Sequence, residues 1–425
     1  MKRDPSKSGA ARPPSSGPRW REAIRRFTWD RLGNRTREAV HGEAVLTPAF
    51  GIVLVLTFLG FAFEQTLRPV IPLVVVDRGG GATLVGLVAA IHALPALLFR
   101  PMIGRLIDGG HHLRLLRIGA VTATLAPVGV LLPGIASLAV VRFLQGSSWA
   151  LYAVSTRTLM ARLAPAHRRG EASGYFALMP ALATLIGPGV GVALYLAIGE
   201  IGPVAIAVAL GVGAIATATA VRIPSDQDDP RGSAHPGQAT PEGRIVESSA
   251  LPPTVMITTF LAGQTLFTVF PPLYVIAIGA SLESLAIYYP VYGAVMVLSQ
   301  SIAGRVSDRV GRGWATRIGC SIAITGLVTA GIGGQIWIFT VGAVAYAVAV
   351  SIVVPTMSAM AIDRAPASRL GAAMATYSIG YQLATGASSL AWGGILSVAG
   401  FEMAFATAIG LQVVTIGLSA RYTRR

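Results

Sequence analysis

Residues 304–312 read Gly-Arg-Val-Ser-Asp-Arg-Val-Gly-Arg, a polar and basic stretch between two long apolar segments. A partial copy lies two hundred positions earlier and keeps the residues Gly104, Arg105 and Asp108. Residues 117–119, Arg-Ile-Gly, recur as residues 317–319 at the same displacement. Two separate motifs that share one displacement predict that the chain consists of two homologous halves.

Long apolar segments surround both copies of the stretch. The sequence contains twelve of them, at residues 48–72, 82–105, 114–133, 136–162, 172–198, 202–222, 251–277, 283–305, 314–334, 336–361, 371–398 and 401–420. Each is about long enough to cross a hydrocarbon core of about 30 Å at about 1.5 Å per residue. Because the segments lack the two-residue alternation of barrel strands, we predict transmembrane helices.

The composition excludes several classes of protein. Hydrophobic residues make up 53% of the chain and charged residues 12%, whereas soluble domains carry about 25% charged residues. A soluble enzyme and a fibrous chain are therefore excluded, and the single Cys320 supports neither a disulfide framework nor a cysteine-based metal site. The predicted fold class is an all-α membrane protein with twelve transmembrane helices in two pseudo-symmetric six-helix bundles.

The charge distribution predicts the orientation of these helices. The chain has 34 basic and 19 acidic residues, and most basic residues fall in the N-terminal tail and in alternate loops. Because cytoplasmic loops carry an excess of Lys and Arg, we expect a multi-pass protein of the inner or plasma membrane with both termini in the cytoplasm. The predicted parts are a basic cytoplasmic tail (1–47), an N-terminal bundle (48–222), a central cytoplasmic loop (223–250) and a C-terminal bundle (251–421).

The N-terminal tail has two interpretations. Trp20, Ile24 and Phe27 lie at helical spacing among many arginines. This pattern fits an interfacial helix on anionic lipid, and it fits a disordered basic segment equally well. Nucleic acid binding by the tail is a distant third interpretation. For the protein as a whole we expect a small organic substrate and membrane lipid as partners, no nucleic acid, and a monomer.

Two motifs carry a resemblance to a known family. Residues 304–312 match the signature G-x-x-x-D-R-x-G-R in full, whereas the first copy has Gly109 and His111 at two signature positions. Residues 142–146, Arg-Phe-Leu-Gln-Gly, match R-x-x-Q-G. Across residues 48–421 the chain resembles the major facilitator superfamily. This resemblance implies that two bundles rock about a substrate site between them, near the middle of the membrane.

The resemblance implies a gating role for the first of these motifs. Its members in the two halves are Gly104, Arg105, Asp108, Gly304, Arg305, Asp308, Arg309, Gly311 and Arg312. The carboxylates can accept hydrogen bonds from helix N-terminal amides, and the arginines can pair with them, so the contacts would form in one conformation and break in the other. The alternative is a cytoplasmic anchor that fixes topology without switching.

A third motif indicates a subgroup of the family. Residues 187–191, Gly-Pro-Gly-Val-Gly, are similar to the G-P-x-x-G-G motif of bacterial drug/proton antiporters, with Val192 in place of the last Gly. We interpret Gly187, Pro188 and Gly191 as a helix-bend motif that limits leak along the pathway, because Pro removes a helix hydrogen bond and Gly lets backbones approach. Ordinary packing of membrane helices is the alternative.

The predicted proton-coupling residues are Glu64, Arg142 and His92. Glu64 is the only acidic residue well inside an apolar span, and ionisable residues inside a membrane mark functional sites by default. We expect the proton, Arg142 and the substrate to compete for Glu64. The alternative is a fixed structural pair with Arg142, or with Arg68 one turn along the helix. His92, in the middle of its span, is either a proton relay or a hydrogen-bonded packing residue.

The predicted substrate-binding residues are amides and aromatics in the first, fourth, seventh and neighbouring spans. They are Gln65, Gln145, Trp149, Tyr152, Gln264, Tyr288, Tyr292, Tyr377, Tyr381 and Gln382. Such side chains suit a small organic, amphiphilic molecule in an apolar pocket. Each of them is also consistent with helix packing or with anchoring at the membrane interface.

The leading functional prediction is a secondary active transporter that exports small organic or drug-like compounds by proton-coupled alternating access. A proton gradient would supply the energy, and we expect no cofactor, no metal and no enzymatic activity. An importer that works by proton symport or facilitated diffusion is the second possibility. A non-transporting membrane receptor or enzyme is a third, although the sequence has no Walker loop, metal-ligand cluster or nucleophile constellation.

Overall fold

The computed structural model describes residues 45–99, 102–103, 106, 111–165, 168–220, 247–366 and 369–422. In this part of the chain every regular element is helical, as predicted. Three parts of the predictions lie outside the described residues: the tail up to residue 44, residues 221–246 (the end of the N-terminal bundle and most of the central loop), and the first-copy residues Gly104, Arg105 and Asp108. Residues from Pro48 onward belong to one compact unit.

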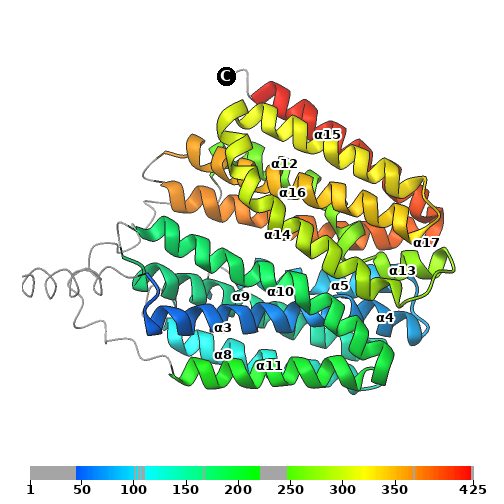
Figure 1. The fold of residues 1–425 in the computed structure, drawn as a ribbon, viewed down its shortest axis with the longest axis horizontal. Coiled ribbons are helices and arrows are strands. Elements are labelled where there is room, and N and C mark those ends of the chain that lie inside the picture. The colour runs from blue at the N-terminus through cyan, green and yellow to red at the C-terminus, as the bar shows by residue number, and fades with distance from the viewer. Residues whose placement is uncertain are drawn as a thin grey trace, which may run out of the picture. The chain divides into compact units, whose positions relative to one another are not determined.

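Within the described residues, each of the twelve predicted segments lies in a helix or in two consecutive helices (Figure 1). In the first half these are α3 (Pro48–Leu67), α4 (Val70–Asp77), α5 (Ala82–Ile91), α6 (Ala93–Leu98), α8 (His112–Leu125), the 3-10 helix η1 (Ala126–Leu131), α9 (Ile135–Leu163), α10 (Arg169–Ile198) and α11 (Ile201–Ala220). In the second half they are α12 (Leu251–Thr268), α13 (Pro271–Ala277), α14 (Ser284–Val310), α15 (Arg312–Gly331), α16 (Ile336–Arg364) and α17 (Leu370–Tyr422). A short 3-10 helix, η3 (Ser248–Ala250), precedes α12 at the end of the predicted central loop. Gly400 has non-helical angles inside α17 and separates the last two predicted segments.

Six helices in the described residues are long and apolar enough to cross a membrane, namely Pro48–Asp77, Leu113–Leu131, Glu171–Ile198, Ile201–Ala220, Ile336–Arg364 and Ala372–Arg421. A seventh span is Ser248–Thr268 together with Pro271–Ala277, two pieces that meet at 54°. The other predicted spans are also helical, but α9 carries three arginines and α14 ends in the polar stretch 304–310. The lower hydropathy of these two helices therefore reflects internal polar residues, whereas Ala82–Leu98 is apolar but shorter than the other spans.

Glycines with positive φ mark equivalent turns in the two halves. Such angles favour glycine because it has no Cβ. Gly79 and Gly279 have φ values of 79° and 65°, and Gly134 and Gly334 have values of 83° and 54°. Both pairs are two hundred positions apart. The repeat read from the sequence is thus a repeat of backbone conformation as well.

Prolines break the first helix of each half at equivalent positions. Pro72 and Pro272 are two hundred positions apart, and proline has no N–H to donate to the carbonyl four residues earlier. The helix accordingly ends at Leu67 in the first half and at Thr268 in the second half, and a short helix continues beyond each break.

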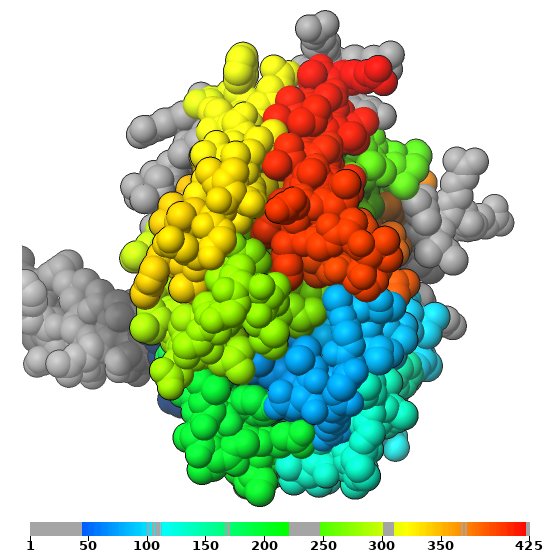
Figure 2. Space-filling model, turned by 90° about the vertical axis from the view of Figure 1, so that its right-hand side faces the viewer, coloured from blue at the N-terminus to red at the C-terminus, as the bar shows by residue number. Residues whose placement is uncertain are grey.

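Helices of the two halves contact each other through glycine. A Cβ on Gly86 of α5 would lie 2.3 Å from the carbonyl oxygen of Ser389 in α17, and one on Gly293 of α14 would lie 2.7 Å from Cα of Leu185 in α10. Figure 1 shows α10 and α14 side by side at the junction of the halves. In Figure 2 the segments near residues 80, 280 and 395 meet on one face of the molecule. At these contacts backbone lies directly against backbone.

Candidate functional site

The site is built around Glu64, which lies near the end of α3 and is 1% exposed. Helix α10 packs directly on this part of α3. A Cβ on Gly191 would lie 2.0 Å from the carbonyl oxygen of Thr66, and one on Gly187 would lie 2.8 Å from Cβ of Gln65. The two glycines of the predicted helix-bend motif therefore allow close packing beside Glu64. Pro188 lies inside the continuous helix α10, and a bend at this position stays a prediction.

His92 lies at the junction of α5 and α6. The junction has a local cause, because Pro95 has no N–H to donate to the carbonyl of Ile91. Helix α9 contacts the junction closely, and a Cβ on Gly146 would lie 2.1 Å from the carbonyl oxygen of His92. The glycine of the R-x-x-Q-G motif thus brings the α9 backbone against His92.

Glu64, His92 and Arg142 meet in one cluster. His92 Nε2 lies 3.0 Å from Glu64 Oε1, and Arg142 Nη1 lies 3.5 Å from the same oxygen. Arg142 Nη1 also donates to Gln145 Oε1 at 3.1 Å. All four side chains are buried. The structure therefore brings together all three predicted proton-coupling residues, which come from α3, the α5–α6 junction and α9.

The hydrogen bonds of this cluster are incomplete. Among the described residues, Glu64 Oε2, Arg142 Nε and Gln145 Nε2 are buried without a hydrogen-bond partner, and His92 Nε2 has only its ion-pair contact. Burying charges is costly unless their remaining donors and acceptors are satisfied. A cluster with unsatisfied hydrogen-bond donors and acceptors inside a membrane protein is therefore a candidate site for a proton or a polar ligand.

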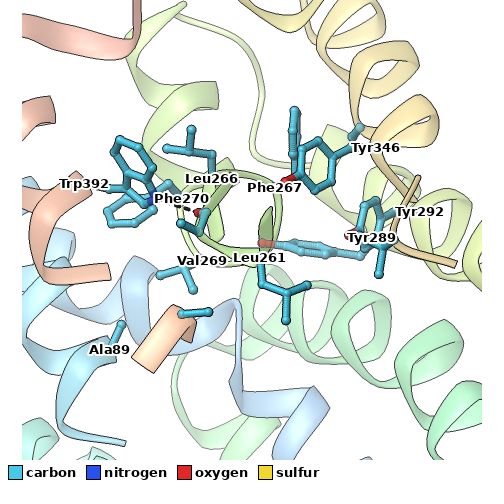
Figure 3. Packing of buried hydrophobic residues seen from close by; sticks show 14 of the residues in the cluster. Ala89, Leu261, Leu266, Phe267, Val269, Phe270, Tyr289, Tyr292, Tyr346 and Trp392 are labelled. Carbon is cyan, nitrogen blue, oxygen red and sulfur yellow. Dashed lines mark hydrogen bonds between the residues drawn. The ribbon is translucent and has the colours of Figure 1, made fainter. Parts of the chain in front are cut away.

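A cavity of about 60 Å³ borders the cluster and lies between the two halves. Arg68, His92 and Arg142 line it from the first half, and Gln264 and Tyr381 line it from the second. Figure 3 shows two apolar residues of its wall, Ala89 and Val269, on neighbouring elements of the two halves. Pockets for organic ligands typically hold about 300–1,000 Å³. The conformation seen here has room for water but not for an organic substrate.

Among the predicted substrate-binding residues, Gln264 and Tyr381 lie in the cavity wall. Gln264 Nε2 donates to the hydroxyl of Tyr292 at 3.3 Å, which joins a third predicted residue to this wall. Gln145 contacts the cluster through Arg142. Gln65 donates to the hydroxyl of Thr184 at 2.6 Å.

The remaining predicted substrate-binding residues make packing contacts. Tyr152, Tyr288 and Tyr377 each donate a hydrogen bond from the hydroxyl to a backbone carbonyl, which ties neighbouring helices together. Trp149 packs edge-on against Phe61, with ring centroids 4.3 Å apart. Gln382 is buried and is not part of the cavity wall.

Arg68 is a site residue that the sequence analysis did not assign to the site. It follows α3 directly, lies half-buried and lines the cavity. In the described part of the chain no acidic side chain lies within ion-pair distance of Arg68. In the sequence, Arg68 stands beside a proline near the end of an apolar span. We interpreted this arginine only as an alternative partner for Glu64.

The gating motif is described in part. Gly311 has a φ of 83° and separates α14 from α15. Arg312 Nε lies 3.3 Å from Asp363 Oδ2, so the motif contacts the end of α16. Gly304, Arg305, Asp308 and Arg309 lie in the last turns of α14, where the structure describes the backbone only. Their proposed switching role stays a prediction.

Comparison with known proteins identifies the family. The family model of the Major Facilitator Superfamily matches residues 53–332 and 255–425. The chain belongs to the major facilitator superfamily. The predicted fold class, twelve transmembrane helices in two pseudo-symmetric six-helix bundles, is confirmed by this match and by the solved structures of similar fold. The superfamily member described here is therefore an integral membrane protein of a transporter family.

Solved structures show the same fold at low sequence identity. A D-xylose-proton symporter superposes with a TM-score of 0.73 at 16% identity, over 87% of this chain and 96% of that chain. The nucleoside transporter NupG superposes with a TM-score of 0.69 at 12% identity, over 88% and 99% of the two chains. A staphylopine export protein of Staphylococcus aureus is 29% identical over 143 residues, which are 34% of this chain and 36% of that protein. The chain thus matches only about a third of the length of this relative.

Proposed function

We propose that this superfamily member is a proton-coupled secondary exporter of small organic compounds that works by alternating access. One observation carries the proposal: Glu64 lies within ion-pair distance of both His92 and Arg142, beside a cavity that both halves line. We place the protein in the inner or plasma membrane with both termini in the cytoplasm, as the distribution of basic residues favours.

The cluster suggests how a proton would drive transport. When Glu64 is ionised, its carboxylate holds Arg142 in place through Oε1. When a proton neutralises the carboxylate, Arg142 loses its counter-ion, so the contact between α3 and α9 that holds the substrate-binding conformation is weakened and the substrate is released. His92 contacts the same oxygen and lines the cavity, so it is placed to pass a proton between the cavity and Glu64.

Two findings favour export over import. Residues 187–191 are similar to the antiporter motif, and their glycines pack α10 against the segment that carries Glu64. In addition, the partial match to the staphylopine export protein is a match to an exporter.

Transport into inverted membrane vesicles tests the proposal. Vesicles with and without the protein are exposed to a panel of small organic compounds, and the accumulated compounds are measured by mass spectrometry. We expect the compounds to accumulate only when the vesicle lumen, which corresponds to the outside of the cell, is more acidic than the medium. A protonophore should abolish this accumulation. Accumulation that ignores the gradient would reject proton coupling, and uptake confined to right-side-out vesicles would favour an importer.

A pair of matched variants tests the role of Glu64. We expect Glu64→Gln to lose gradient-driven accumulation by about a hundredfold, in the range that a positioned proton-transfer group contributes. Glu402→Gln makes the same chemical change at an exposed position of α17 and should leave accumulation unchanged. Equal activity of the two variants would remove Glu64 from the mechanism.

A further inference from the structure

The charges around the cavity are unevenly distributed. Arg68, His92 and Arg142 line it, whereas no Asp or Glu of the described residues does. Glu64 lies behind His92 and Arg142, is 1% exposed and does not reach the wall. The single carboxylate balances one of the two arginines, so the group keeps a net positive charge of one when His92 is neutral.

The excess charge is located mainly on Arg68. Its side chain has no ion pair within the described residues, and it is half-buried at the cavity. Arg142 Nε, on the neighbouring helix, is buried without an acceptor among the described residues. A guanidinium withdrawn from water is stabilised by an oxyanion that accepts two hydrogen bonds from it. Both arginine side chains thus line the cavity, and Arg142 also has a donor that no described residue satisfies.

The opposite wall is neutral. Gln264, Thr265 and Thr268 of α12 and Tyr381 and Thr385 of α17 supply it. The Gln264 amide N–H donates to Tyr292, and the Thr268 and Thr385 hydroxyls donate to their own helices. Oxygen lone pairs therefore remain on this wall, together with apolar surface from Leu261 and Val269.

We propose that the substrate is an organic monoanion, a carboxylate whose charged group binds Arg68 and Arg142 and whose neutral body lies against α12 and α17. This assignment rests on the proposed transport function and narrows its substrate class. An organic cation would meet uncompensated positive charge on the first-half wall. A doubly charged phosphate would exceed the one positive charge that Glu64 leaves unbalanced.

Ligand binding by the purified full-length protein in detergent tests this assignment without any gradient. The probes are matched triplets that share one body and differ in charge: indole-3-acetate, indole-3-acetamide and tryptamine, then benzoate, benzamide and benzylamine, then gluconate, glucose and glucamine. Thermal unfolding is followed as each probe is titrated. We expect at least one acid to stabilise the protein, with an apparent affinity about tenfold or more above those of its amide or neutral analogue and its amine, as expected for charge-assisted hydrogen bonds.

Variants of Arg68 identify the group responsible. Arg68→Gln should reduce the preference for the acid to within about threefold, and Arg68→Lys should give an intermediate preference, because lysine keeps the charge but not the two parallel donors of the guanidinium. Arg421→Gln, in the exposed last turn of α17, is the matched control and should keep the full preference. Stabilisation by inorganic phosphate equal to that by the acids would replace the carboxylate with a phosphate.

Four results would overturn the assignment: no acid stabilises the protein, amines or neutral analogues bind as well as acids, inorganic phosphate binds as well as acids, or Arg68→Gln keeps the preference. This experiment and the vesicle experiment fail separately. If the protein binds acids through Arg68 but transports nothing in response to protons, the substrate assignment stands and the proposed export function is rejected. A proton-driven exporter without preference for acids would retain the function and lose the site.

Discussion

The two halves of the molecule carry the same pair of positions with different chemistry. Glu64 and His92 in the first half correspond, two hundred positions on, to Gln264 and Tyr292 in the second. The first pair is in contact at 3.0 Å, and the second pair is hydrogen-bonded at 3.3 Å. One contact between the first two spans of each half therefore exists twice, once between titratable groups and once between neutral groups. The comparison supports the proposal that proton chemistry belongs to the first half and neutral recognition to the second.

The helix packing beside these two pairs also differs between the halves. In the first half, Gly187 and Gly191 bring the α10 backbone onto α3. In this part of the chain the repeats are 201 and not 200 positions apart, so Ser388 and Trp392 correspond to Gly187 and Gly191. These two residues of α17 fill the equivalent contact with α12. The Trp392 indole N–H donates to the Ala262 carbonyl at 2.7 Å. The second half thus joins its helices through side chains, as the large residues around α12 in Figure 3 also show.

Exchanging the carboxylate and the amide between the halves should give the largest effect. The double variant Glu64→Gln with Gln264→Glu keeps the composition of the cavity region but moves the carboxylate away from the position that contacts both Arg142 and His92. We expect gradient-driven transport in vesicles to fall by about a hundredfold, as for loss of a positioned proton-transfer group. Restoration of transport to the wild-type level by the exchange would show that the halves are equivalent and would break the comparison.

Gly191→Ala should give the next largest effect, on stability. The new Cβ would lie 2.0 Å from the Thr66 carbonyl oxygen, so α10 and α3 must separate, at a cost of about 1–3 kcal/mol for such overpacking. Thermal unfolding in detergent measures this change. Gly174→Ala is the matched control in the same helix, because a Cβ at that position meets nothing within 4 Å. Equal stability of the two variants would contradict the close backbone contact.

His92→Gln and Tyr292→Phe should separate coupling from binding. His92→Gln keeps a polar side chain but removes the titratable group beside Glu64, and we expect the dependence of transport on the proton gradient to weaken by about tenfold. Tyr292→Phe removes the acceptor of the Gln264 amide and should raise KM by about threefold to tenfold while the gradient dependence is kept, as for loss of one neutral hydrogen bond. Vesicle transport at several substrate concentrations and proton gradients distinguishes the two results. The same response from both variants would argue against the division between the halves.

The sequence alone predicted the fold well, because the thickness of a bilayer sets the length of the apolar segments and because basic residues concentrate in the loops between them. It also predicted that Arg142 interacts with Glu64, since ionisable residues in apolar spans are rare and mark functional sites, and the two side chains are in contact. It did not predict which aromatics line the cavity, because Tyr152 and Tyr288 bond to backbone carbonyls of neighbouring helices and a sequence does not show which way a hydroxyl points. Arg68 was missed as a cavity residue because the break before Pro69 decides its direction.

The smallest expected effect concerns the loop signature, which the second half keeps in full and the first half keeps in part. Asp363→Asn removes the carboxylate that contacts Arg312 in an ion pair whose two side chains are 34% and 56% exposed. Because exposed ion pairs contribute about 0–1 kcal/mol, the midpoint of thermal unfolding in detergent should shift little. A gate would respond differently: if the contact holds one conformation, the variant changes the transport rate more than its small loss of stability. A large fall in stability with an unchanged transport rate would instead identify the signature as a fixed structural contact. The difference between the two copies of the signature would then concern stability and not gating.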